Sequence, residues 1–185
     1  MNSIGQIIVT VFASLGLSGT SVAAQNMNLK VFFDLVAIGS ASEVAQALER
    51  EPALAKARDQ YDFTAIHMLD EIEFDEKLAL LQRFGADVNA QNDQGHALLH
   101  FIITPEFIPT IVAAGGDINL RDVWGRTPIM VSLTEPDAFN FLPAYLEAGA
   151  DPSARDAKGQ SVLDYAAAFE NPELIGMLVQ AGAKQ

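Results

Sequence analysis

Three histidines and one acidic cluster are the side chains of this sequence whose types and spacing come closest to a chemical site. His67 and His100 stand 33 residues apart, and His96 is expected in a solvent-exposed loop outside the helix that contains His100. We therefore predict no pair of histidines on one helix face that could bind zinc. The acidic cluster lacks the turn glycine and the twelve-residue layout of a calcium loop, so a solvated loop is predicted for it. Its members are Asp70, Glu71, Glu73, Asp75 and Glu76.

Other catalytic patterns are also missing from the sequence. No serine stands in a nucleophile-elbow motif, and no glycine-rich loop follows a strand in the way a phosphate-binding loop does. We therefore expect no catalytic residue, no metal ligand and no cofactor, and we predict that the protein is not an enzyme.

Glycine recurs at regular intervals instead. The stretch Gly85-Ala86-Asp87-Val88-Asn89 comes back at Gly115 and Gly149, with a partial copy at Gly182, at separations of 30, 34 and 33 residues. Ten residues after each of the first three copies begins, a further glycine stands at Gly95, Gly125 and Gly159. A constant interval between glycines predicts a loop of fixed backbone path, because glycine adopts the positive φ that turns require.

Polar residues mark the middle of each predicted loop. Seven residues after each leading glycine stands Asn92, Asp122 or Asp156. Counting back one unit places Pro52 and Asp62 where glycines would be expected, with Asp59 at the turn position. The pattern therefore extends to the beginning of the chain after its first thirty residues.

Apolar residues between these loops have helical spacing. The residues four positions before each leading glycine, or before Pro52, are Leu48, Leu81, Ile111, Tyr145 and Leu178. Further positions, seven and eight before, are also mostly apolar, so each unit has one apolar stripe. A second, shorter helix is expected after each loop, and Thr104-Pro105 and Asn171-Pro172 are predicted helix starts. We predict that the stripes stack into one continuous core.

Three copies carry a resemblance to a known family: GRTPI at 125–129, LLQRFGADVNA at 80–90 and YLEAGADPSARD at 145–156. These resemble the ankyrin repeat family, and 31–59 resembles an N-terminal unit of it. The resemblance implies an all-α fold, an ankyrin-repeat solenoid of about five helix-turn-helix units with β-turn fingers. The domain would cover 25–185, with units of approximately 28–58, 59–91, 92–121, 122–155 and 156–185. It also implies that His67 and His100 order turns by hydrogen bonding.

The third unit departs from this pattern because it is three residues short between Gly95 and Gly115. Pro105 and Pro109 also fall there, and a proline inside a helix removes a hydrogen bond. We expect the second helix of this unit to be short, starting near Pro109 or broken around it. Pro143 predicts either a local bend of the stack or a late helix start in the fourth unit.

The resemblance further implies that a protein partner binds the concave face and the fingers. Transferred to this sequence, the pattern gives eleven candidate protein-binding residues. They are Tyr61, Phe63, Met68, Gln94, His96, Phe101, Trp124, Arg126, Val131, Lys158 and Tyr165. Aromatic and arginine side chains are the usual anchors of binding hot spots, and Trp124 is the single tryptophan of the chain.

The composition limits the partner and the compartment. A net charge of −13 disfavours nucleic acid and anionic membrane surfaces, and it suits a basic protein partner. The chain has no cysteine, which excludes disulfides and thiolate zinc sites. Residues 1–24 have an uncharged apolar run followed by Val22-Ala23-Ala24, which predicts a cleaved Sec-type signal peptide and export to the periplasm or the medium.

From these features we expect a monomeric protein-protein interaction module acting in a bacterial envelope, without membrane insertion of the mature chain. An alternative is an immunity-type antagonist or inhibitor of a toxin or enzyme. The partner itself is not identified by the sequence.

Overall fold

A computed structural model describes residues 28–102, 104–135, 138–168 and 170–184 of the 185-residue chain. These residues are helical, with eight α-helices, four short 3-10 helices and no β-strand beyond a single bridge between Arg155 and Ser161. In chain order the elements are α2 (Leu29–Ile38), α3 (Ala41–Arg50), η1 (Pro52–Lys56), η2 (Ala65–Met68), α4 (Phe74–Arg83), η3 (Leu98–His100), η4 (Pro105–Phe107), α5 (Ile108–Ala113), α6 (Pro128–Ser132), α7 (Ala138–Glu147), α8 (Val162–Ala167) and α9 (Pro172–Gln180). The predicted all-α class is confirmed. The predicted signal peptide, residues 1–24, lies outside the described residues and stays a prediction.

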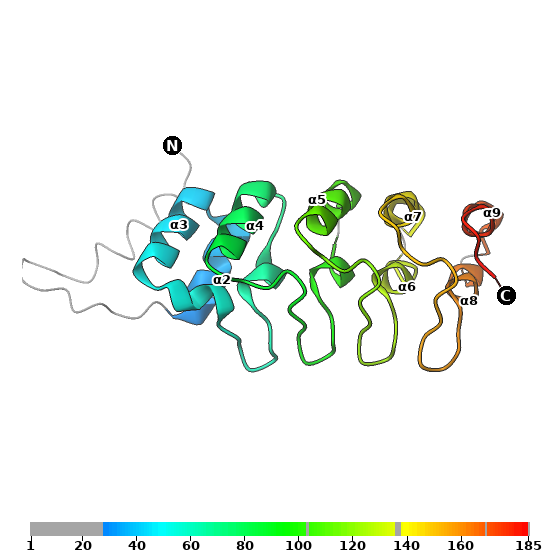
Figure 1. Cartoon of the computed structure of the whole chain (residues 1–185), viewed down its shortest axis with the longest axis horizontal. Helices are drawn as coiled ribbons and strands as arrows, with labels where there is room; N and C mark the ends of the chain where they lie inside the picture. Colours follow the sequence, from blue (N-terminus) through cyan, green and yellow to red (C-terminus); the bar gives the residue numbers. More distant parts are fainter. Residues whose placement is uncertain (1–27, 103, 136–137, 169, 185) are drawn as a thin grey trace, which may run out of the picture.

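The helices stand in a row that follows the order of the sequence. Figure 1 shows α3, α4, α5, α7 and α9 side by side, with α6 beneath α7 and α8 beneath α9. Helices contact the partner of their own pair, as α6 does with α7 and α8 with α9, and the neighbouring helix in the row, as α7 does with α9. Long loops extend from one edge of this row (Figure 1). The architecture is therefore a repeat-like array in which each unit contacts its neighbours.

A column of apolar side chains forms the predicted core of this array. The five residues Leu48, Leu81, Ile111, Tyr145 and Leu178 are each at most 1% exposed. The Tyr145 hydroxyl keeps a partner inside the core by donating to the carbonyl oxygen of Leu99 at 2.7 Å. Burial of these five side chains by neighbouring helices confirms that the stripes pack against one another.

One position of this apolar pattern holds a lysine. Lys77 on α4 is fully buried, and its Nζ donates to the carbonyl oxygen of Val36 at 2.7 Å. Burial lowers the pKa of this ammonium from its ordinary value, although the nearby Glu73 and Asp70 carboxylates oppose the change. The lysine therefore ties α4 to the end of α2 through one hydrogen bond.

The helix starts show which capping predictions hold. Asn171 caps α9, since its Oδ1 accepts from the backbone N of Glu173 at 2.9 Å, as predicted. Thr104 and Pro105 hold the predicted cap and first positions, but of the 3-10 helix η4; the Thr104 side chain makes no capping bond, and α5 starts only at Ile108. The Thr104 hydroxyl donates to Glu71 instead, at 2.7 Å.

The prolines shape the third and fourth units differently. Helix α5 has only six residues and includes Pro109, so the predicted short helix is confirmed. Helix α7 contains Pro143 as its sixth residue and does not begin late. Pro143 has no N–H, so the carbonyl of Phe139, a residue that is 38% exposed, lacks the usual helical donor.

Four loops repeat one backbone design, and we call them the finger loops: 59–63, 92–96, 122–126 and 156–160. In each, the backbone N of the first residue donates to the carbonyl oxygen of the fifth at 2.9 to 3.0 Å. The fourth residue has positive φ, which Asp62 adopts at 61° where Gly95, Gly125 and Gly159 adopt 76° to 82°. Asp62 thus takes the place of a glycine, since aspartate tolerates this conformation better than most residues.

Adjacent finger loops are hydrogen-bonded to one another. Asp93 N donates to Tyr61 O, Val123 N to Gln94 O and Ala157 N to Trp124 O, at 2.9 to 3.1 Å. Arg58, Gln91 and Arg121 each precede a finger loop, and their side chains donate to a carbonyl in that loop and to the carbonyl of the residue just before the next loop. These hydrogen bonds therefore hold the finger loops in place relative to one another, so the loops are not independent turns.

Helix lengths bear on membranes as well. In the described parts of the chain, no helix has both the length and the apolar character needed to cross a bilayer.

Candidate protein-binding surface

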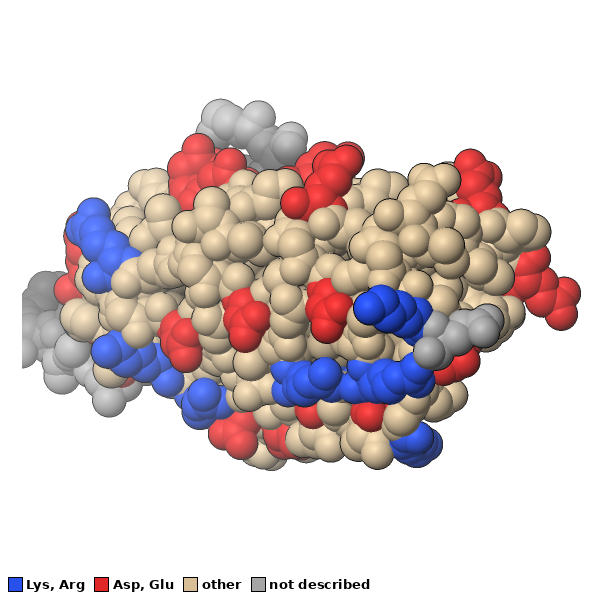
Figure 2. All heavy atoms as spheres, turned by 45° about the vertical axis from the view of Figure 1, so that its right-hand side comes forward, with Lys and Arg blue, Asp and Glu red and all other residues tan. Residues whose placement is uncertain are grey.

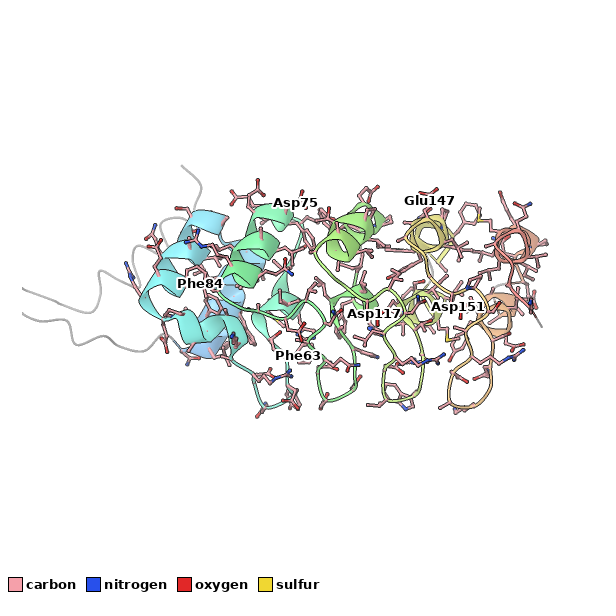
Figure 3. All side chains as sticks on the ribbon, in the orientation of Figure 1. Phe63, Asp75, Phe84, Asp117, Glu147 and Asp151 are labelled. Atoms are coloured by element: carbon pink, nitrogen blue, oxygen red, sulfur yellow. The ribbon has the colours of Figure 1, made fainter. Side chains whose placement is uncertain are left out.

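All eleven residues predicted to bind protein reach solvent to some degree. Figure 3 shows where one of them, Phe63, lies: on the half of the array nearer the finger loops, while Asp75 and Glu147 lie at the opposite edge. The exposed residues are Tyr61, Gln94, Phe101, Trp124 and Lys158. The half-buried residues are Phe63, Met68, His96, Arg126, Val131 and Tyr165.

Five of the eleven form one continuous group, which we call the aromatic surface: Phe63, His96, Phe101, Trp124 and Arg126. The Phe101 ring centroid is 5.8 Å from that of Phe63 and 5.3 Å from that of His96. The His96 ring is 5.9 Å from Trp124, and the Arg126 guanidinium lies 4.6 Å above the Trp124 ring. These are ordinary distances for aromatic and cation–π pairs, so three finger loops and Phe101, the residue that follows η3, contribute to a single surface.

His67 supports this surface from below. Its Nδ1 accepts from the backbone N of Thr64 at 3.0 Å, and its Nε2 lies 3.1 Å from the carbonyl oxygen of His96. Its ring contacts Phe63 and Phe101 edge-on. His100 repeats the first bond by accepting from Ala97 N at 3.1 Å. The predicted structural role of the two histidines is confirmed by these bonds.

The prediction that His96 is solvent-exposed is wrong, since its side chain is only 12% exposed. The neighbouring loop covers it with Trp124 and Asp122, and its ring stacks on His100 at 5.3 Å. The four-residue separation of His96 and His100 in the sequence was the available signal for this contact. A position in a loop does not decide exposure when the next loop packs against it.

Asp122 holds the aromatic surface together, and its side chain is fully buried. Its Oδ1 accepts from the backbone N of Trp124 at 2.9 Å and of Arg126 at 2.8 Å. Its Oδ2 accepts from Arg126 Nε at 2.7 Å. One carboxylate therefore sets both the loop backbone and the position of the guanidinium above Trp124. Sequence reasoning identified Asp122 as a turn residue but missed this second role.

The three histidines have lowered pKa values. Burial lowers the pKa of His67 and His96 and brings that of His100 to about 4. The Asp122 carboxylate opposes the change at His96, and the neighbouring His96 adds to it at His100. His96 Nε2 lies 3.2 Å from Arg126 Nη2 and 3.3 Å from Asp122 Oδ2, and a neutral ring can only accept from the first or donate to the second.

The other predicted residues lie around this group without joining its ring contacts. Tyr61 is 53% exposed at the first finger loop, and Gln94 and Lys158 are exposed at later ones. The Tyr165 hydroxyl donates to Asp156 Oδ2 at 3.0 Å, and burial together with this bond raises the pKa of Tyr165 to about 12. Among the aromatic residues predicted to bind protein, Phe63, Phe101 and Trp124 therefore belong to the aromatic surface, whereas Tyr61 and Tyr165 lie outside it.

Two cavities flank the short third unit, and both are lined by Phe101 and Ile102. The smaller, about 260 Å³, includes Met68 in its wall, and the larger, about 480 Å³, includes Val131. The three-residue element η3 lies between the two cavities, with Leu98 in the wall of the smaller and His100 in that of the larger. Sequence reasoning found the shortened unit but did not predict the cavities.

The acidic cluster is divided between a loop and a helix. Asp70, Glu71 and Glu73 precede α4, whereas Asp75 and Glu76 lie in its first turn, so the prediction of a loop holds for only part of it. Negative side chains at that end of a helix stabilise it. In the described ranges, no three histidine or acidic side chains are placed so that they could hold a metal ion.

Comparison with known proteins gives relatives but no family. No family model matches the chain. The chain is 31% identical over 168 residues to an intracellular phospholipase A2 of Caenorhabditis elegans, covering 83% of this chain and 15% of that protein. It is 28% identical to the ADP-ribosylation factor GTPase-activating protein AGD2 of Arabidopsis thaliana (85% and 21%) and 25% identical to a neurogenic locus notch homolog protein 1 of Danio rerio (79% and 6%). The chain thus spans about a fifth or less of the length of these relatives.

These similarities bear on two predictions. Most of this chain matches a small part of proteins as different as the notch homolog and the GTPase-activating protein, which points to ankyrin-type repeats. The prediction that the protein is not an enzyme is contradicted by the similarity to the phospholipase A2. It relied on a search for catalytic motifs within the chain, and such a search does not detect kinship with part of an enzyme.

Proposed function

We propose that this chain is a protein-binding module of the ankyrin repeat type, which contacts a protein partner through the aromatic surface and the adjoining finger loops. The observation that carries the proposal is the continuous contact of Phe63, Phe101, His96 and Trp124, with Arg126 stacked on the last. Side chains of these types dominate the binding energy of protein interfaces.

The rigidity of this surface supports the same function. Trp124 is 44% exposed, yet its loop is fixed by Asp122 and by the bond from Ala157 N to Trp124 O. A surface that is already ordered loses less conformational entropy on binding. The aromatic surface therefore has the side-chain chemistry and the preorganisation that a docking site needs.

The repeat-type assignment is supported by the finger loops. Asp59, Asn92, Asp122 and Asp156 each accept from two backbone N–H groups of their own loop, and each loop has positive φ at its fourth position. We propose that the module acts in the periplasm or the medium, because residues 1–24 predict a signal peptide for export. Within this proposal, the net charge of −13 favours a basic partner, including a basic toxin or enzyme that the module would inhibit.

Phospholipid hydrolysis is a second candidate function, favoured by the similarity to part of a phospholipase A2. It is tested by incubating the purified chain with phosphatidylcholine vesicles and measuring fatty-acid release against a heat-denatured sample. Release above that control supports the second candidate, and equal values reject it for this chain.

The test of the proposed function is affinity capture from an extract of the source cell's envelope. The wild type is compared with a Tyr61→Ala, Trp124→Ala double variant and with a control in which two exposed apolar residues elsewhere, Phe139 and Val179, are replaced by alanine. We expect the same partner to be recovered by wild type and control but lost from the first variant. Equal recovery by all three would reject the aromatic surface as the docking site.

A further inference from the structure

We infer that the smaller cavity, between η2 and η3, receives the side chain of a lysine or arginine presented by the protein partner. The inference rests on the proposed function and adds the chemistry that the partner must bring. The smaller cavity adjoins the aromatic surface, because Phe101 belongs to both.

The walls of this cavity are apolar. Phe74 and Phe107 stack at 4.1 Å with nearly parallel rings, and the buried Leu98 and the exposed Phe101 line the cavity with them. A volume of about 260 Å³ is below the usual range of small-molecule pockets and suits one long side chain. The apolar walls would cover the methylene stem of that side chain.

Two carboxylates line the same cavity. Asp70 and Glu71 are both exposed, and each is oriented by a bond at one oxygen. Glu71 Oε1 accepts from the Thr104 hydroxyl at 2.7 Å, and Asp70 Oδ1 accepts from the backbone N of Glu71 at 2.8 Å. Within the described parts of the chain, no hydrogen bond to the second oxygen of either group is found, so each could accept from an incoming cation.

No basic side chain of the described residues forms an ion pair with either carboxylate. The nearest lysine along the chain, Lys77, interacts electrostatically with Asp70, but it is buried, donates to Val36 O and forms no ion pair with either carboxylate. Figure 2 shows on one face of the molecule that Lys and Arg gather mostly in one band while carboxylates are spread more widely. An apolar cavity with two unpaired carboxylates therefore selects a side chain with an apolar stem and a cationic end.

Two short elements of this chain border the cavity. Element η2 has four residues and η3 has three, whereas the corresponding α6 and α8 have five and six. The cavity lies beside these two short elements, and His67, Met68 and Leu98 from them belong to its wall. The smaller cavity is lined by residues of the second and third units, including Asp70 and Glu71, which the larger cavity lacks.

The experiment uses the full chain and three small probes: the N-acetyl methylamides of arginine, norleucine and glutamate. Each is titrated at low salt, where exposed charges are least screened, and followed by two-dimensional ¹H–¹⁵N NMR. We expect saturable shifts of the backbone amides of Asp70, Glu71, Phe101 and Thr104 with the arginine probe, with a dissociation constant in the millimolar range. Weaker shifts are expected with norleucine and none with glutamate.

Two double variants distinguish the effect of the Asp70 and Glu71 carboxylates from the effect of the overall negative charge of the protein. Asp70→Asn with Glu71→Gln keeps the acceptors of the internal bonds and should weaken arginine binding by about threefold to tenfold. The control, Asp75→Asn with Glu76→Gln, removes the same charge from exposed positions of α4 outside the cavity and should leave binding unchanged. Circular dichroism confirms that both variants are folded.

Three outcomes would overturn the inference: no saturable shifts at these amides, equal shifts with all three probes, or equal weakening by the two variants. Partner capture through Trp124 and Tyr61 is measured separately. Failure at the cavity therefore leaves the proposed function standing, and failure of capture leaves the cavity result interpretable.

Discussion

Asp122 is the residue on which the geometry of the aromatic surface depends most. It accepts from two backbone N–H groups and from Arg126 Nε while its side chain is fully buried. Charge-assisted hydrogen bonds to a buried carboxylate stabilise the fold. Removal of the carboxylate leaves its donors without an acceptor.

We predict that Asp122→Ala lowers the free energy of unfolding by about 2 to 4 kcal/mol, because three donors lose their acceptor. Asp122→Asn should cost less, since asparagine already serves at the same loop position as Asn92. Urea unfolding measures both changes. The control Asp93→Ala, at an exposed site of the preceding loop, should change stability by less than about 0.5 kcal/mol. Equal costs for the two alanine variants would contradict this role.

The pKa of His100 gives a second prediction for a single residue. Burial lowers it from the ordinary 6.5 to about 4. In the window from pH 6.5 to 4 the unfolded chain binds a proton at this histidine and the folded chain does not. The free energy of unfolding is therefore independent of the protonation of His100 above pH 6.5. It decreases as the pH falls from 6.5 to 4, with a slope approaching about 1.4 kcal/mol per pH unit.

NMR titration of the imidazole Cε1–H signal measures this pKa directly in the folded protein. We expect His100 to stay neutral at pH 5.5 and to titrate near the lower end of its window. A titration midpoint at or above 6.5 would show that burial does not control this side chain.

At the scale of elements, the finger loops depend on their glycines for two separable reasons. Gly125 and Gly159 have similar φ values, 76° and 82°. A Cβ at Gly125 would lie 2.7 Å from the backbone N of Ala157, whereas one at Gly159 would meet nothing within 4 Å.

We therefore predict that Gly159→Ala costs about 1 kcal/mol through backbone strain alone, and that Gly125→Ala costs clearly more because the loops must move apart. Thermal or urea unfolding of the two variants makes the comparison. A cost for Gly159→Ala equal to or greater than that for Gly125→Ala would contradict the packing of adjacent loops.

The apolar column gives the matching prediction for the helices. Leu178→Ala should cost about 2 to 5 kcal/mol, because a fully buried leucine in α9 leaves a cavity. Val179→Ala removes an apolar side chain that is 55% exposed on the same helix and should cost less than about 0.5 kcal/mol. A loss near zero for Leu178→Ala would contradict the stacked core.

Elements governed by local chemistry could be predicted from the sequence. The interval between glycines gave the finger loops, and helical spacing gave the buried positions of Leu81, Tyr145 and Leu178. Contacts across loops could not be predicted in this way. The burial of His96 depends on Trp124 and Asp122 of the next loop, and Thr104 bonds to Glu71 in the preceding unit rather than capping a helix.

At the scale of the whole molecule, neighbouring loops of the array together form one surface. Backbone bonds connect each loop to the next, so Phe63, His96 and Trp124 are held near one another, and Phe101 packs against the first two. The acidic composition led to the expectation of a positively charged partner. It gave no indication of the similarity to part of a phospholipase A2. A relationship of that kind lies in the sequence as a whole and in no single motif.

The most direct test of the central claim is site-specific photocrosslinking in the source cell. A benzoylphenylalanine is placed at Trp124 on the aromatic surface, or at Glu147, an exposed residue at the opposite edge of the array (Figure 3). We predict that illumination joins the Trp124 position to one protein partner and leaves the Glu147 position without that product. The same partner crosslinked with equal yield from both positions, or no product from position 124, would contradict docking through the aromatic surface.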